Sequence, residues 1–266
     1  MQIYKFEPNS DVFTRNLLLL SKLHSPNMTD QVEIWQQQLL QAARPDKIET
    51  AASFFKTGKG EYAEGDVFIG LSVPDNRAIS KHYCQLPMAD FARMLASEVH
   101  EIRFAALIAL TYRYKSVQHN QGMARQIVDF YLSQSKRINN WDLVDCSAHK
   151  ILGQYMVDFG EYDLAQRLSH SSCVWDVRIA MISTYQLIQA GKLDLTFTLA
   201  QQLLAHPHDL IRKAVGWMLR EAGKKDRNRL IAFLDQYAPT MARTTLRIAI
   251  ERLDNATRRY YMTLRP

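Results

Sequence analysis

A short pattern recurs along this chain and constrains its fold more than any other feature. Five segments carry an aliphatic residue, a polar residue, a variable residue and then Ala or Ser. Their polar positions lie 42, 33, 34 and 35 residues apart, at Arg103, Asp145, Arg178, Arg212 and Arg247. A period of this size is typical of two-helix repeats stacked into a solenoid.

The segments between these copies support an all-α fold. Amphipathic stretches such as "MARQIVDFYLSQS" and "LTFTLAQQLLAH" end at "FGEYD", "QAGKLD", "HPHD" and "EAGKKD". Gly or Pro after an apolar run, followed by Asp, is the expected signal for one helix ending and another beginning. We therefore predict a single α-helical HEAT-like repeat domain over residues 1–266, with a concave basic face.

One segment departs from the helical pattern. Residues Lys56–Pro74 are rich in glycine and contain the apolar run "VFIGLSV". This composition predicts a short β-hairpin or an ordered loop. The spacing GxxxxGK[ST] is missing, so a structural or substrate-touching loop is favoured over a phosphate-binding one.

Composition restricts the class of protein further. The 266 residues are 47% hydrophobic, enough for a core without disulfides or a structural metal. Cys84, Cys146 and Cys173 are scattered, with no CxxC, which favours a reducing compartment. An acid and a proline interrupt the start "MQIYKFEPNSDVF", and "NLLLL" is far shorter than a membrane span. We expect a cytoplasmic, nucleoid-associated monomer that binds no membrane, metal or cofactor.

Positive charge is concentrated in the last quarter of the chain. The net charge is +6, but residues 200–266 contain 13 Lys and Arg against 6 Asp and Glu. The preceding 199 residues contain 20 against 21. A basic region of this kind is a weak indication of a polyanionic partner, usually nucleic acid. The alternative is a solvated surface rich in arginine because arginine favours helices.

Asp145 is the exception among the five repeat positions. Arginines at successive repeats would form a phosphate-binding stripe, and a carboxylate there weakens it. Either Asp145 makes a buried hydrogen bond or salt bridge to a neighbouring arginine, or it takes part in chemistry. Trp141 lies one helical turn before it, and Trp175 and Trp217 flank the next two positions. Aromatic faces and a carboxylate together suit a positively charged reacting group.

These residues resemble a known family. The chain is similar to the AlkD-like alkylpurine DNA glycosylases, which are built of HEAT-like repeats, over about residues 30–262. The resemblance is carried by "NNWDLVD" (139–145), "WDVRIAM" (175–181) and "IRKAVGWMLRE" (211–221), with support from "SFFK" (53–56) and "RTTLRIAIERL" (243–253).

The resemblance implies a function and a set of site residues. Asp145 would be the catalytic carboxylate, and Trp141 and Trp217 the aromatic walls beside the sugar of the lesion. The reaction would hydrolyse the N-glycosidic bond of N3- or N7-alkylpurines in double-stranded DNA, initiating base excision repair. Arg178 would hold the DNA backbone. The other predicted DNA-binding residues are Arg212, Lys213, Arg247 and Phe54, with Phe55 an alternative to Phe54.

Two other functions stay open. The glycine-rich segment resembles the hairpin of related members that bind branched DNA without evident base excision. The chain would then be a non-catalytic protein that binds DNA structures. A third interpretation is a repeat scaffold with no role on DNA, against which the basic C-terminal region and the tryptophan cluster argue.

Overall fold

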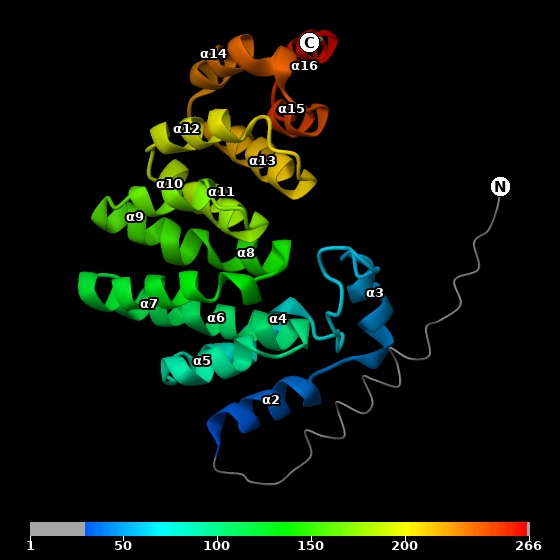
Figure 1. The fold of residues 1–266 in the computed structure, drawn as a ribbon, viewed down its shortest axis with the longest axis vertical. Helices are drawn as coiled ribbons and strands as arrows, with labels where there is room; N and C mark the ends of the chain where they lie inside the picture. The colour runs from blue at the N-terminus through cyan, green and yellow to red at the C-terminus, as the bar shows by residue number, and fades with distance from the viewer. Residues whose placement is uncertain (1–29, 265–266) are drawn as a thin grey trace, which may run out of the picture. The chain divides into compact units, whose positions relative to one another are not determined.

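The computed structural model describes residues 30–264, and they are almost entirely helical (Figure 1). This confirms the all-α prediction. The sequence features at the start of the chain, including "NLLLL", lie outside the described residues. Within 30–264, no helix is long and apolar enough to cross a membrane.

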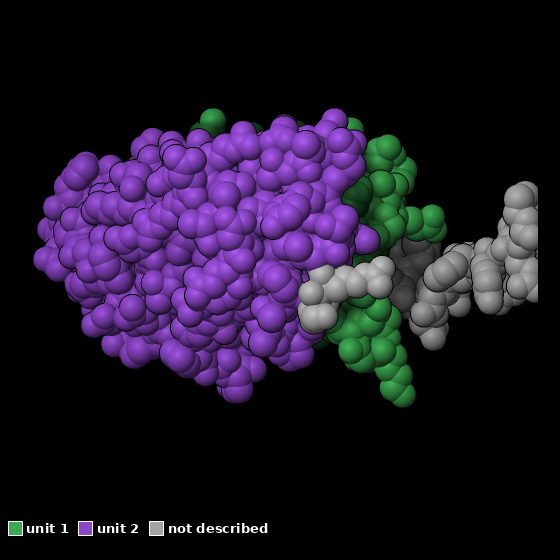
Figure 2. Space-filling model, turned by 90° about the horizontal axis from the view of Figure 1, so that it is seen from above, with its two compact units in different colours: residues 1–112 green, residues 113–266 purple. Residues whose placement is uncertain are grey.

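The chain divides into two compact units, residues 1–112 and 113–266, which Figure 2 colours separately. The prediction of one domain over residues 1–266 stays a prediction. The helices of unit 1 are α2 (Gln31–Gln41), η1 (Pro45–Lys47), α3 (Ile48–Ser53), α4 (Val73–Ser80), η2 (Lys81–Tyr83), α5 (Met88–Leu95) and most of α6 (His100–Val117). Those of unit 2 are α7 (Gln121–Ser133), η3 (Ser135–Arg137), α8 (Trp141–Ser147), η4 (His149–Gly153), α9 (Gln154–Phe159), α10 (Asp163–Ser169), α11 (Val174–Gln189), α12 (Asp194–Leu203), α13 (Asp209–Lys225), α14 (Arg227–Tyr237), η5 (Ala238–Thr240), α15 (Arg243–Ala249) and α16 (Asn255–Thr263).

Unit 1 is built around Trp35 of α2. Its side chain is fully buried, with its ring stacked on Tyr83 at 4.8 Å and edge-on to Phe91 at 6.2 Å between centroids. Asp30 caps the helix by accepting a hydrogen bond from the Val32 amide. Aromatic packing therefore fixes α2 against the helices that follow it.

Of the two alternatives predicted for the glycine-rich segment, the structure shows the ordered loop and not the β-hairpin. Its residues form turns, and Val67 makes an isolated parallel bridge to Val99. The buried carboxylate of Glu101 accepts hydrogen bonds from the amides of Ile69 (3.1 Å) and Gly70 (2.9 Å). The carboxylate of Glu101 on α6 thus accepts the hydrogen bonds that these amides would donate to a partner strand in a hairpin.

Unit 2 is a helical-repeat solenoid. Its two longest helices, α11 and α13, pack against each other, and α13 packs against α15 in turn (Figure 1). Most of α11 is buried, because α8, η4, α10, α12 and α13 all pack against it. Neighbouring repeats therefore share a continuous core.

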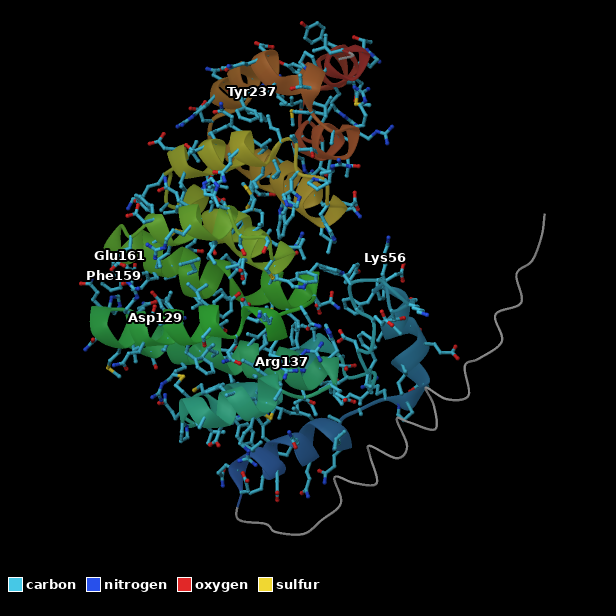
Figure 3. The ribbon with its side chains drawn as sticks, in the orientation of Figure 1. Lys56, Asp129, Arg137, Phe159, Glu161 and Tyr237 are labelled. Atoms are coloured by element: carbon cyan, nitrogen blue, oxygen red, sulfur yellow. The ribbon has the colours of Figure 1, made fainter. Side chains whose placement is uncertain are left out.

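A polar cluster joins α7 to the α9–α10 connection (Figure 3). Arg125 donates hydrogen bonds to Asp129 (2.8 Å) and Glu161 (2.8 Å). The Tyr155 hydroxyl donates to Glu161 at 2.6 Å, and the Gln121 side chain donates to the same carboxylate at 3.2 Å. These hydrogen bonds hold α7, α9 and the connection between α9 and α10 together.

Glu101→Ala should loosen the glycine-rich segment. Two buried amides would lose their acceptor, at a cost of about 3 kcal/mol. We expect hydrogen exchange at Ile69 and Gly70 to accelerate about 100-fold. Glu64→Ala is the control, because Glu64 is exposed and accepts only from the Gly60 amide among the described hydrogen bonds. Equal acceleration in both variants would contradict the role given to Glu101.

Candidate functional site

Asp145 and Arg178 form a two-point ion pair between α8 and α11. Arg178 Nε donates to Asp145 Oδ1 at 3.0 Å, and Nη2 donates to Oδ2 at 2.7 Å. The Arg178 side chain is 5% exposed and that of Asp145 is 17% exposed. Arg178 Nη1 also donates to the Leu210 carbonyl at the start of α13. A buried guanidinium thus fixes a carboxylate whose side chain stays partly exposed.

The charge of Asp145 depends on this arginine. Burial raises the pKa of the Asp145 carboxyl, and the nearby Asp142 acts in the same direction. The Arg178 guanidinium opposes the rise through its charge and its hydrogen bonds. Arg178 therefore favours the ionised form in a place where desolvation disfavours it.

Trp141 lies on the same face of α8 as Asp145. It is the first residue of the helix, and the buried Asn140 caps that end by accepting a hydrogen bond from the Trp141 amide at 2.8 Å. Four residues separate Trp141 from Asp145, so both side chains project on one face, one turn apart. Both are half-buried. Trp175 is 7% exposed and packs in the core.

Trp217 ends a row of aromatic rings that crosses three elements. The His149 ring of η4 meets Tyr185 of α11 edge-on at 5.4 Å between centroids. Tyr185 lies 6.2 Å from the ring of Trp217 on α13. All three are half-buried. Tyr185 was not among the residues predicted from the sequence, although it lies two turns after Arg178 and therefore on the same face of α11.

A π-helical turn follows directly after Asp145 and Cys146. In η4 the Gly153 amide donates to the Ala148 carbonyl, five residues back, at 3.0 Å. A Cβ at Gly153 would lie 2.4 Å from the Ser183 carbonyl of α11. Only glycine therefore permits this close approach of the two helices. Such turns are frequent at functional sites, and periodicity alone does not reveal them.

The repeat arginines have different partners. Arg103, in unit 1, is buried and donates to Asp66 and to the Ser97 carbonyl six residues back. Arg212 is half-buried and likewise donates to the carbonyl six residues back, that of His206, at 2.9 Å. At these two positions the repeated arginine fastens the loop before its own helix. The DNA contacts predicted for Arg178 and Arg212 stay predictions.

The remaining predicted DNA-binding residues are exposed. Lys213 pairs with Asp209 one turn earlier at 2.7 Å, and Arg247 lies on α15. In unit 1, Phe54 ends α3 with 69% of its surface exposed. Phe55 instead stacks on Phe68 at 5.1 Å. Phe54 is therefore the more exposed of the two candidate phenylalanines.

The described part of the chain contains no group of three or more His, Cys, Asp or Glu side chains suited to a metal ion. His206 and His208, which flank a proline, form a helix start. His208 Nδ1 accepts from the Leu210 amide, and His206 Nδ1 accepts from the His208 amide.

Comparison with known proteins identifies the class. The model of the DNA alkylation repair enzyme family matches residues 35–253, most of the chain. The chain belongs to this family, as its motifs indicated. A solved structure, "Predicted DNA alkylation repair enzyme from Enterococcus faecalis", is similar with a TM-score of 0.61 at 15% identity. The match covers 80% of this chain and 97% of the other, and it supports the fold. No curated protein matches the chain.

Arg178→Ala should destabilise unit 2 by about 3 kcal/mol or more, because it leaves the Asp145 charge without its partner in a largely buried place. Urea unfolding would measure this loss. Arg212→Ala removes a half-buried arginine that bonds to one carbonyl, and we expect a smaller effect. Equal losses in the two variants would show that the ion pair has no special role in stability.

His149 should make stability fall at acid pH. Burial, with the charge of Lys150, lowers the pKa of His149 from 6.5 to about 4. The unfolded chain then binds a proton more readily than the folded one between pH 6.5 and 4. The contribution of His149 to the free energy of unfolding is complete above pH 6.5. It falls by up to about 3 kcal/mol as the pH drops to 4.

The free energy of unfolding across this pH range tests the assignment. His149→Gln should flatten the fall, whereas His170→Gln, which replaces an exposed histidine of the same unit, should leave it in place. An unchanged fall in His149→Gln would assign the acid sensitivity to other groups.

Proposed function

We propose that this protein is a DNA glycosylase that hydrolyses the N-glycosidic bond of positively charged N3- or N7-alkylpurines. The observation that carries the proposal is the Asp145 carboxylate, fixed at two points by Arg178 and still 17% exposed, one helical turn after Trp141. Membership of the DNA alkylation repair family supports DNA as the substrate.

The substrate supplies much of the driving force. An alkylated purine carries a positive charge, so the bond between the anomeric carbon and the base nitrogen breaks with its electron pair moving to the base. The base leaves neutral, and the positive charge passes to the deoxyribose. Water then adds to the anomeric carbon and releases a proton. The cationic leaving group removes the need for the general acid that sugar hydrolases use.

Asp145 is suited to stabilise the charge that develops on the sugar. A fixed carboxylate at a poorly solvated site interacts with a nearby cation more strongly than one in water. Arg178 occupies one side of the carboxylate, and 17% of the side chain stays accessible. The accessible edge would face the sugar and orient the attacking water. Removing such an electrostatic contribution typically costs about 3 kcal/mol in the barrier.

The aromatic residues would contact the sugar and the cationic base. Trp141 and Trp217 are half-buried, so each offers part of its ring to a ligand. Aromatic faces attract cations. The lowered pKa of His149 leaves this neighbour of Tyr185 uncharged at neutral pH. The aromatic row therefore adds no positive charge that would repel a cationic purine.

The DNA backbone would be held by residues outside this centre. The predicted contacts are Arg212, Lys213, Arg247 and Phe54. Arg178 is also predicted to hold the backbone, and its ion pair positions Asp145 as well. Binding of this kind should weaken steeply with salt, because phosphate contacts release counterions. The product would be a site without a base, which the later steps of base excision repair would process in the cytoplasm.

Asp145→Asn should lower the release of free base from N3- and N7-methylated DNA by about 100-fold or more. The matched control is Asp142→Asn, which changes a half-buried carboxylate on the same helix and should retain release. Base release under single-turnover conditions is the measurement, with thermal unfolding of each variant as the check on folding.

Each outcome of this experiment has a defined meaning. Release by the wild type and Asp142→Asn, but not by a folded Asp145→Asn, supports catalysis by Asp145. Unfolding of Asp145→Asn would assign the carboxylate a structural role. Binding without release by the wild type would favour the non-catalytic protein that binds branched DNA, and would direct attention to the glycine-rich segment.

A further inference from the structure

A cleft of about 440 Å³ lies between α15 and α16 in unit 2. Helix α15 and its C-cap contribute Arg247 and Ile250. Helix α16 contributes Asn255, Arg258, Arg259 and Met262. The four α16 residues follow the spacing i, i+3, i+4, i+7, so they form one face of that helix. A face that packs on a neighbouring helix is normally apolar, but this one carries two arginines and an asparagine.

The cleft has an excess of positive charge. Its three arginines are exposed, and among residues 30–264 no carboxylate lines it. The acids nearby have other partners, because Glu251 pairs with Arg220 and Asp254 pairs with Arg227 at 2.7 Å. Arg220, with a smaller contribution from Arg258, lowers the pKa of Glu251. The described lining of the cleft therefore contains three cationic side chains and no acid.

The walls of the cleft are held by contacts made away from it. Tyr261 is 2% exposed, and its hydroxyl donates to Asp235 of α14 at 2.6 Å. Arg243 donates to the carbonyls of Met262 and Leu264, at and just beyond the end of α16. Asp254 caps the start of α16 through the Thr257 amide at 2.9 Å. The helix is thus fixed at both ends and on its buried side.

We propose that this cleft binds a phosphodiester group of the DNA backbone, away from the reacting sugar. Guanidinium groups bind phosphate oxygens through paired hydrogen bonds, and the Asn255 amide adds donors. Ile250 and Met262 offer apolar surface for the adjoining deoxyribose. The assignment rests on DNA being the partner in the proposed function, but it does not depend on base release.

The test compares two double variants that remove the same charge. Arg258→Gln with Arg259→Gln changes the cleft. Lys225→Gln with Arg252→Gln changes exposed cations outside it. Fluorescence anisotropy would measure binding of undamaged duplex DNA at roughly 50 to 200 mM salt. We expect the cleft variant to bind about tenfold more weakly at about 0.1 M salt, with a salt slope smaller by about 1, and the control to change much less.

Two results would overturn the proposal. Equal losses in both double variants would show a general electrostatic effect without a built site. Millimolar inorganic phosphate, added at constant ionic strength, should not change how much more tightly the wild type binds DNA than the cleft variant does. If it abolishes that difference, the cleft is a site for a small free anion. Base release is measured separately at saturating DNA, so absence of release would remove the proposed catalysis without affecting this result.

Discussion

The ion pair between Asp145 and Arg178 connects helices of unit 2 and also positions the carboxylate proposed for catalysis. The three hydrogen bonds of Arg178 connect α8, α11 and the start of α13, so one guanidinium ties together three helices from successive repeats. A buried pair stabilises a fold only where geometry and additional hydrogen bonds offset the loss of hydration. Here the two-point geometry and the additional bond to Leu210 are present, although burial still raises the pKa of Asp145. The residue proposed for catalysis is thus positioned by the contact that holds the repeats together.

This pair also explains why a carboxylate interrupts the arginine pattern. Arg103 and Arg212 reach back to a carbonyl six residues earlier and fasten the loop before their own helix. At Asp145 the repeat position accepts hydrogen bonds, and Arg178 from the next repeat reaches across to it. Asp145 therefore accepts a contact from the next repeat at the position where Arg103 and Arg212 donate to the loop before their own helix. Asp145 thus makes the salt bridge that the structural interpretation expected, and this salt bridge is compatible with a catalytic role.

The sequence predicted the features that depend on local pattern. Helix ends at "FGEYD" and "HPHD" follow from Gly160, which adopts a left-handed conformation, and from capping by His208. For the glycine-rich segment the sequence left a hairpin and an ordered loop open; the loop forms, with the amides of Ile69 and Gly70 donating to Glu101, more than 30 residues away. The π-helical turn at His149 has the same apolar periodicity as an α-helix at this length. The hydrogen-bond partner of each arginine was also not predictable, because a guanidinium can donate equally well to a loop carbonyl, a carboxylate or a phosphate.

The repeat arginines become more accessible along the chain, and this separates two electrostatic requirements. Arg103 and Arg178 are buried, Arg212 is half-buried, and Arg247 is exposed beside Arg258 and Arg259. A polyanion is attracted by unpaired positive charge, whereas a cationic purine is repelled by it. Near Asp145 the arginine is paired and the histidine has a pKa of about 4. Exposed arginines line the cleft at α15 and α16 instead, so attraction for the backbone would not oppose charge development at the sugar.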